Sequence, residues 1–230
     1  MPEIEPSGAT SGKHPIQFFH QRSERYRFMV DEGIIDDLET SGLCWLATTD
    51  MALSAFLRNP EVRLDVIRNI AAAMNMAGRL DQYGRLDMSG NGEFAAAINK
   101  ANRDASLPVK AWTDEYDDLE ESLLASVANG VALLSVGDES WEHVYVVDDS
   151  FFCPEKKERS VRIWDPLMGD ANQGATIVSL HQLNGWLENA DLSFIPPLVT
   201  FSKTRWETQL PLLPQHSIVF HPEHLALQAA

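Results

Sequence analysis

The stretch NGVALLSVGDESWEHVYVVDD (residues 129–149) marks the point where the chain changes from a helical to an extended pattern. Before it, apolar residues recur every three or four positions; after Gly130 they form short runs separated by turn residues. Five such runs are typical of strands: 131–136, 141–147, 161–164, 198–201 and 217–220. Helices first and antiparallel strands second predict an α+β fold rather than a βαβ array.

Upstream of this point the clearest helix begins near SGLCWLA (41–47). Cys44, Ala47, Met51 and Ala55 recur at helical spacing, so they share one face. We expect Thr40 or Ser41 to cap this helix and Pro60 to end it. Asn59-Pro60 then opens a second helix, because a capping side chain followed by a first-turn proline is a typical start.

Weaker signals complete the outline. Residues 16–40 predict an ordered, partly helical lead-in, while 93–103 and 115–128 predict two further helices. Ser179 and Gln182 form a capping box before a short helix. We expect a disordered tail over 1–15, which is rich in Pro, Gly and Ser, and a single domain over 16–225 with the helix that contains Cys44 packed on a C-terminal antiparallel sheet.

The charge of the chain limits its partners. With 34 acidic and 18 basic residues the formal net charge is -16, which disfavours nucleic acid and anionic bilayers. No apolar stretch is long enough for membrane insertion, and the N-terminus has no Sec-type signal pattern. We therefore expect a cytoplasmic protein or one exported by a specialised secretion system.

Cysteine and histidine usage gives no sign of a metal or another cofactor. The two cysteines, Cys44 and Cys153, permit one disulfide but cannot make a zinc site, and Cys153 is interpreted as a loop thiol. His221 and His224 lack a nearby third ligand and are interpreted as surface residues. The prediction is no metal and no cofactor.

Cys44 is the first candidate for chemistry. In the first turn of a helix, free backbone N–H groups and the positive end of the dipole favour a thiolate. The same N–H groups can bind an oxyanion that forms beside the sulfur. The alternative is a small buried hydrophobic residue, which is how most free cysteines behave.

His143 and Asp165 are the next candidates. His143 lies in an otherwise apolar strand, where each ring nitrogen needs a partner. Asp165 ends the following strand, and an antiparallel hairpin can bring the two side chains together. Taken singly, a satisfied core histidine and an Asp-Pro turn remain alternatives.

Three segments together, GLCWLA (42–47), NGVALLSVG with EHVYVVDD (129–149) and VRIWDPLMG (161–169), resemble the papain-like cysteine peptidase superfamily. The resemblance covers roughly residues 40–190. Within the superfamily, this part of the chain is similar to the bacteriocin-leader-peptidase-like and bacterial effector-type branches. The resemblance implies a protease acting on a protein or peptide substrate. The resemblance also implies that Cys44 is the nucleophile, that His143 is the general base and that Asp165 is the acid that orients His143.

One feature departs from that family pattern. Family members carry a glutamine shortly before the cysteine that completes the oxyanion hole, and residues 38–43 contain none. Gln17 and Gln21 lie further upstream as candidate replacements, and the backbone N–H of Trp45 is a third candidate. Two other functions stay open: a glutamine deamidase or transglutaminase-like enzyme with the same triad, and a catalytically inactive papain-like binding module.

Overall fold

The computed structural model describes residues 16–87, 91–114, 119–138, 141–154, 157–167, 175–189 and 198–202. The predicted tail over 1–15, the predicted strand at 217–220 and the pair His221 and His224 lie outside the described residues. All statements on the structure below concern the described ranges.

The helical elements are η1 (Glu24–Tyr26), α1 (Phe28–Asp31), α2 (Cys44–Ser54), α3 (Pro60–Met76), α4 (Asn91–Asp104), α5 (Leu119–Asn129) and α6 (Leu180–Asn189). The strands are β1 (Lys110–Asp114), β2 (Val131–Asp138), β3 (Trp141–Cys153), β4 (Glu158–Trp164), β5 (Ala175–Ser179) and β6 (Leu198–Ser202). They form one six-stranded sheet in the order β1-β6-β2-β3-β4-β5, with every neighbouring pair antiparallel. The predicted α+β class is confirmed.

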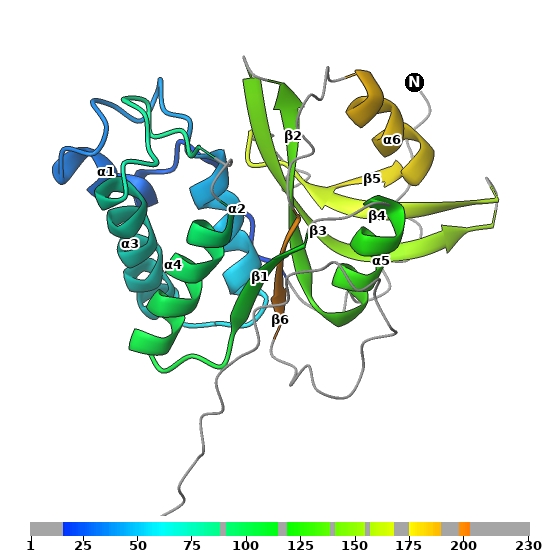
Figure 1. Ribbon diagram of the computed structural model, residues 1–230, viewed down its shortest axis with the longest axis horizontal. Coiled ribbons are helices and arrows are strands. Elements are labelled where there is room, and N and C mark those ends of the chain that lie inside the picture. Colours follow the sequence, from blue (N-terminus) through cyan, green and yellow to red (C-terminus); the bar gives the residue numbers. More distant parts are fainter. Residues whose placement is uncertain are drawn as a thin grey trace, which may run out of the picture.

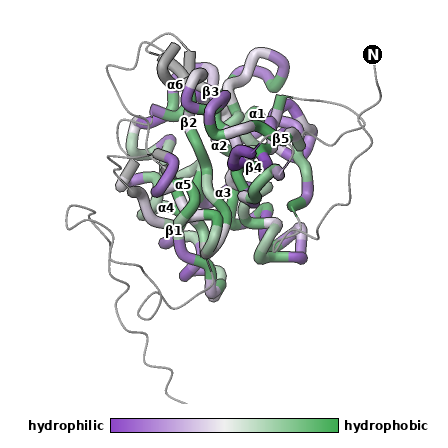
Figure 2. Tube along the Cα trace, turned by 90° about the vertical axis from the view of Figure 1, so that its right-hand side faces the viewer, coloured by the Kyte–Doolittle hydropathy of each residue, from purple (hydrophilic) through white to green (hydrophobic). Residues whose placement is uncertain are grey.

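Helices cover the sheet from both sides (Figure 1). The helices α2, α3 and α4 gather on one side, where α2 packs against β3 and β2, while α5 and α6 pack on the other side. Alternate residues of β2 divide between these layers, since Val131 and Leu133 belong to one apolar cluster and Ala132 and Leu134 to the other. Most of β2 is accordingly hydrophobic in Figure 2.

Two predicted helix starts are confirmed. The Asn59 side chain accepts hydrogen bonds from the N–H groups of Glu61 and Val62 at 3.0 and 3.4 Å, so it caps α3 ahead of Pro60. At the start of α6 the Ser179 hydroxyl accepts from the Gln182 N–H at 3.1 Å, and the Gln182 side chain accepts from the Ser179 N–H at 3.3 Å. This reciprocal pair is the predicted capping box.

The expected cap of α2 is wrong. The N-cap residue is Leu43, and no side chain caps this end. Thr40 instead pairs with the carboxylate of Asp37, and the Ser41 hydroxyl donates to the carbonyl of Leu38 at 2.7 Å. The helix also ends at Ser54 rather than at Pro60, so a short connection precedes α3. The absence of a side-chain cap leaves the first N–H groups of α2 open to a ligand.

The strand predictions were incomplete at the edges of the sheet. Strands β1 and β5 were not predicted; both are edge strands of five residues. Strand β3 extends to Cys153, which therefore ends a strand paired with Glu158 instead of lying in a loop. Both Cys44 and Cys153 are free thiols.

Among the described residues, no helix combines the length and the apolar composition that crossing a membrane requires.

Candidate active site

Cys44 is the first residue of α2, at the end that carries the unsatisfied N–H groups. Its side chain lies near the surface of the core, with 9% of the residue exposed. The next residue, Trp45, is anchored on both sides: its indole N–H donates to the carbonyl of Gly84 at 2.7 Å, and its ring packs edge-on against Phe94. This anchoring sets the direction of the first helical turn and with it the position of the Cys44 sulfur.

His143 and Asp165 are in direct contact. The register of β3 and β4 pairs Val146 with Trp164, so Asp165, the residue after β4, comes beside the strand that carries His143. Nε2 of His143 and Oδ1 of Asp165 are 2.7 Å apart. Oδ1 also accepts the backbone N–H of Leu167 at 2.8 Å, which holds the carboxylate in place.

His143 also hydrogen-bonds to Cys44. Because Nε2 faces Asp165, Nδ1 is the ring nitrogen left for the sulfur. The three residues predicted from sequence thus form one chain of contacts, from the start of α2 through β3 to the end of β4. Both imidazole nitrogens have partners, as a buried histidine requires.

The charge state of this chain follows from its environment. Burial disfavours the charged form of His143, but hydrogen bonds to Asp165 and Cys44 outweigh it and raise the pKa of His143 to about 9. Burial also acts to raise the pKa of Asp165, yet the hydrogen bonds from His143 and from the Leu167 N–H leave that pKa below its ordinary value. At neutral pH the pair is an imidazolium beside a carboxylate.

Gln21 lies next to this chain of contacts. Its backbone N–H donates to the carbonyl of Pro166 at 3.0 Å, and its Nε2 lies 3.5 Å from the carbonyl of Ser41. It therefore bridges the segment before Cys44 and the turn after Asp165. The residue is 6% exposed, and its Oε1 has no hydrogen-bond partner among the described residues. This oxygen is an acceptor and cannot bind an oxyanion, but the Nε2 amide carries two N–H groups, of which the Ser41 carbonyl takes one.

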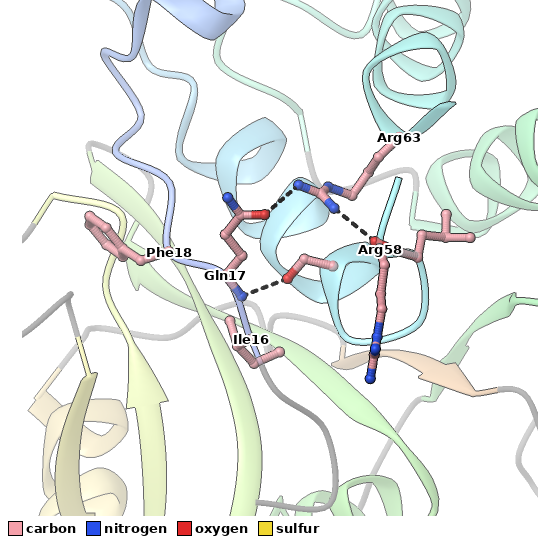
Figure 3. A pocket seen from close by; sticks show the side chains of 7 residues that line it. Ile16, Gln17, Phe18, Arg58 and Arg63 are labelled. Atoms are coloured by element: carbon pink, nitrogen blue, oxygen red, sulfur yellow. Dashed lines mark hydrogen bonds between the residues drawn. The ribbon is translucent and has the colours of Figure 1, made fainter. Parts of the chain in front are cut away.

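Gln17 is placed elsewhere. Its backbone N–H donates to the Ser54 hydroxyl at 2.8 Å, at the opposite end of α2 from Cys44, and its Oε1 accepts from Arg63 at 2.8 Å (Figure 3). It lines an open hollow of about 550 Å³ together with Ile16, Phe18, Ser54, Leu57, Arg58 and Arg63. Of the two glutamines predicted from sequence, the structure brings only Gln21 to the site, so Gln17 drops out as an oxyanion candidate.

The backbone N–H of Trp45 is in the first turn of α2, as the sequence predicted. The N–H groups of such a turn have no acceptor within the helix. Together with the Gln21 amide they supply the donors from which an oxyanion hole is built.

Tyr145 is a site residue that sequence reasoning did not select. It lies two residues after His143 on the same face of β3, and their rings meet edge to face with centroids 4.8 Å apart. Burial, followed by the negative charges of Asp165 and Cys44, raises the pKa of Tyr145 to about 12. The alternation of side chains along a strand was the available signal, because it places residues two apart on one face.

Comparison with protein-family models, with curated proteins and with solved structures finds no match to this chain. The interpretation of the site therefore depends on its own residues. The described part of the chain contains no group of three or more His, Cys, Asp or Glu side chains arranged to hold a metal ion.

Proposed function

We propose that this chain is a cysteine hydrolase of the papain-like type that cleaves amide bonds in a protein or peptide through Cys44, His143 and Asp165. The single observation that carries the proposal is the continuous hydrogen-bonded chain from Cys44 through His143 to Asp165, with 2.7 Å between His143 and Asp165. A nucleophile, a base and an orienting acid in this order are the minimal set for nucleophilic acyl transfer.

The first half of the reaction forms an acyl-enzyme. The Cys44 sulfur attacks the carbonyl carbon of the substrate amide, and the carbonyl oxygen becomes an oxyanion held by backbone N–H groups of α2 and the amide of Gln21. His143 donates its Nδ1 proton to the leaving nitrogen as the C–N bond breaks. The products of this half are a thioester on Cys44 and a free amine.

The second half restores the enzyme. His143, now neutral, accepts a proton from water as the water oxygen attacks the thioester. The C–S bond breaks, the acid product leaves, and the thiolate–imidazolium pair forms again. Asp165 holds the ring in one orientation throughout and stabilises its positive charge.

Gln21 supports an active enzyme over an inactive binding module. The inactive alternative follows from the missing glutamine before Cys44, and Gln21, whose amide lies 3.5 Å from the Ser41 carbonyl, is a candidate for that role from a different part of the chain. Its Nε2 carries two N–H groups and the Ser41 carbonyl takes one of them, so the second is a donor that an oxyanion can use.

The experiment is to incubate the full chain with a pool of defined proteins and peptides and to analyse the products by mass spectrometry, with Cys44→Ser as control. Chain cleavage in the wild type alone supports the peptidase. A mass increase of about 1 Da at glutamine residues, which follows from amide-to-acid chemistry, would support the deamidase instead. Crosslinked products would support the transglutaminase-like enzyme. No Cys44-dependent product of any kind would contradict catalysis.

A further inference from the structure

The loop over residues 79–87 is fastened directly to the segment that carries Cys44. The N–H of Gly42 donates to the carbonyl of Tyr83 at 2.8 Å, and the Trp45 indole donates to the carbonyl of Gly84 at 2.7 Å. A backbone bridge between Leu80 and Leu86 closes the loop. The loop is therefore held in a fixed position beside residues 42–45, the segment that contains Cys44. We call this loop, residues 79–87, the wall.

Glycine is required at two points of this contact. Gly84 has φ of 73° and packs so closely that an added Cβ would lie 2.8 Å from Ile35 and 2.9 Å from Leu43. At Gly42 an added Cβ would overlap the Cγ atom of Arg85. The aliphatic part of Arg85 thus lies directly on Gly42, whose carbonyl oxygen is 4.0 Å from the Cys44 sulfur.

The two side chains that project from this wall are exposed and suited to a ligand. Tyr83 is 41% exposed, and the Arg85 guanidinium lies 5.3 Å from the centre of its ring. Within the described ranges Arg85 forms no ion pair. Asp81 of the loop is engaged through Oδ1 with the backbone N–H groups of Tyr83 and Arg85 at 2.9 and 2.8 Å.

We propose that Tyr83 and Arg85 form a binding subsite for an acidic residue of the substrate next to the bond that Cys44 attacks. This inference rests on the proposed function and adds a substrate class to it. A guanidinium binds a carboxylate through two parallel hydrogen bonds, and the Tyr83 ring holds the guanidinium in position. In a chain of net charge -16, an arginine that lies beside the segment of Cys44 and has no ion pair within the described ranges also offsets the repulsion that an acidic substrate would meet.

The experiment compares the alkylation of Cys44 in the full chain by two probes of similar size, anionic iodoacetate and neutral iodoacetamide, with Cys44 identified by peptide mapping. Because the His143 imidazolium attracts iodoacetate in every variant, the informative quantity is the rate ratio of the two probes in a variant relative to that in the wild type. We expect Arg85→Ala to lower this ratio by about two- to five-fold, the range of an exposed ion pair, and Arg85→Glu to lower it further. Arg85→Lys keeps the charge and should keep most of the ratio, and Arg103→Ala, an exposed arginine on α4, should leave it unchanged.

The outcomes separate the two proposals. If Cys44 reacts faster than Cys153 but Arg85→Ala leaves the rate ratio unchanged, the subsite is refuted while the nucleophile stands. If Cys44 reacts no faster than Cys153 with either probe, the proposed function fails and the subsite fails with it. The iodoacetamide rate serves as an internal check on folding, because a locally disturbed Arg85 variant would change it as well.

A second arm uses peptides matched in pairs, with Glu or Gln at each position flanking the cleaved bond. Wild type should cleave the Glu member faster at one position, and Arg85→Glu should remove or reverse that preference. Equal cleavage of both members at every position by the wild type would overturn the proposal.

Discussion

Helix α2 holds buried charge at two places, at its first residue Cys44 and around Asp50 in its second half, and the two places differ in how fully that charge is paired. At the start of the helix, Cys44 and His143 meet Asp165, whose side chain is 19% exposed, and Gln21 keeps an unused acceptor. Further along, Asp50 is fully buried and every part of its carboxylate is engaged. Oδ1 accepts from Arg63 at 2.6 Å, while Oδ2 accepts from Arg25 at 2.5 Å and from the Tyr26 hydroxyl at 3.3 Å.

The second cluster has a structural explanation. Arg25 and Arg63 also face the ring of Phe19 at 5.0 and 5.1 Å, so the Asp50 cluster ties the N-terminal segment to α2 and α3. Fully satisfied buried charge of this kind specifies an arrangement of elements. The group at the start of α2 is less completely enclosed, because the Asp165 side chain is partly exposed and the amide oxygen of Gln21 has no partner among the described residues. It therefore has hydrogen-bonding atoms that a substrate can use. The Asp50 cluster and the candidate active site thus differ in how completely their buried polar atoms are paired.

The sharpest way to test this distinction is Cys44→Ser. We expect hydrolysis to fall by about 10⁴-fold or more, because a serine hydroxyl is a much weaker nucleophile than a cysteine sulfur at neutral pH. The free energy of unfolding should change by only about 1–2 kcal/mol, since the volume is nearly conserved. Product formation and chemical denaturation measure the two quantities. Cys153→Ser is the matched control and should leave the rate intact; if it were the inactivating change, the nucleophile would be misassigned.

Asp50→Ala should show the opposite profile. Removing the carboxylate leaves Arg63, which is 1% exposed, buried without its partner, so we expect a loss of about 3–5 kcal/mol in the free energy of unfolding. Hydrolysis by the fraction that remains folded should persist. Urea denaturation measures the loss, and Asp65→Ala, an exposed carboxylate on α3, is the control. A loss below about 1 kcal/mol would mean that the Asp50 cluster does not hold the N-terminal segment.

Gln21→Ala tests the spare amide. Loss of one oxyanion donor should lower kcat/KM by about 10²–10³-fold. Alkylation of Cys44 by iodoacetamide, which forms no oxyanion, should stay near the wild-type rate. Gln17→Ala at the other end of α2 should do the reverse, destabilising the fold through the loss of its contact with Arg63 while leaving kcat/KM unchanged. Equal effects of the two substitutions on kcat/KM would remove the distinction between the helix ends.

The pH dependence tests the ion pair at the catalytic end. Because the pKa of His143 is raised to about 9, its imidazolium persists through neutral pH, and kcat/KM should fall as the pH rises through about 9. The ion pair of His143 contributes its full stability below about pH 6.5, the pKa of histidine in an unfolded chain. This contribution is lost as the pH rises through the folded pKa of about 9. Asp165→Asn removes the negative partner and should shift the fall in kcat/KM to lower pH, whereas Asp149→Asn on β3, the strand that carries His143, should not. An unshifted profile in Asp165→Asn would contradict the assigned role.

The smallest effect concerns Tyr145. The edge-to-face ring contact shields the imidazole, so Tyr145→Phe, which keeps the ring, should change kcat/KM less than about two-fold. Tyr145→Ala admits water to His143 and relieves part of the burial that disfavours the imidazolium, which should raise the pKa of His143 and move the alkaline fall to higher pH. The pH profile of both variants measures this. An identical profile for Tyr145→Ala and wild type would make Tyr145 a packing residue only.

Local signals in the sequence account for much of the fold. The change of pattern at Gly130, the Asn59 cap and the Ser179 capping box depend on residues within a few positions of one another, and the structure bears out all three. The edge strands β1 and β5 escaped prediction although β6, which has the same length, did not; β1 pairs only with the distant β6, a contact that leaves no local signal. The side-chain cap expected for α2 was also misplaced, since Thr40 and Ser41 satisfy Asp37 and Leu38 instead.

By itself the sequence determined the α+β class, the position of Cys44 at a helix start and the candidate partners His143 and Asp165. These depend on residue types at short spacing and on the pairing of two consecutive strands. Only the tertiary structure decided whether Gln17 or Gln21 lies near Cys44. It also decided that Asp50 is buried between two arginines and that the side chain of Arg85 lies on Gly42. Each of these involves contacts between segments far apart in the sequence, as Gln21 is from Ser41, 20 positions away. Such contacts leave no periodic trace, because they depend on how the helices and the loop pack around α2 rather than on any local preference of the chain.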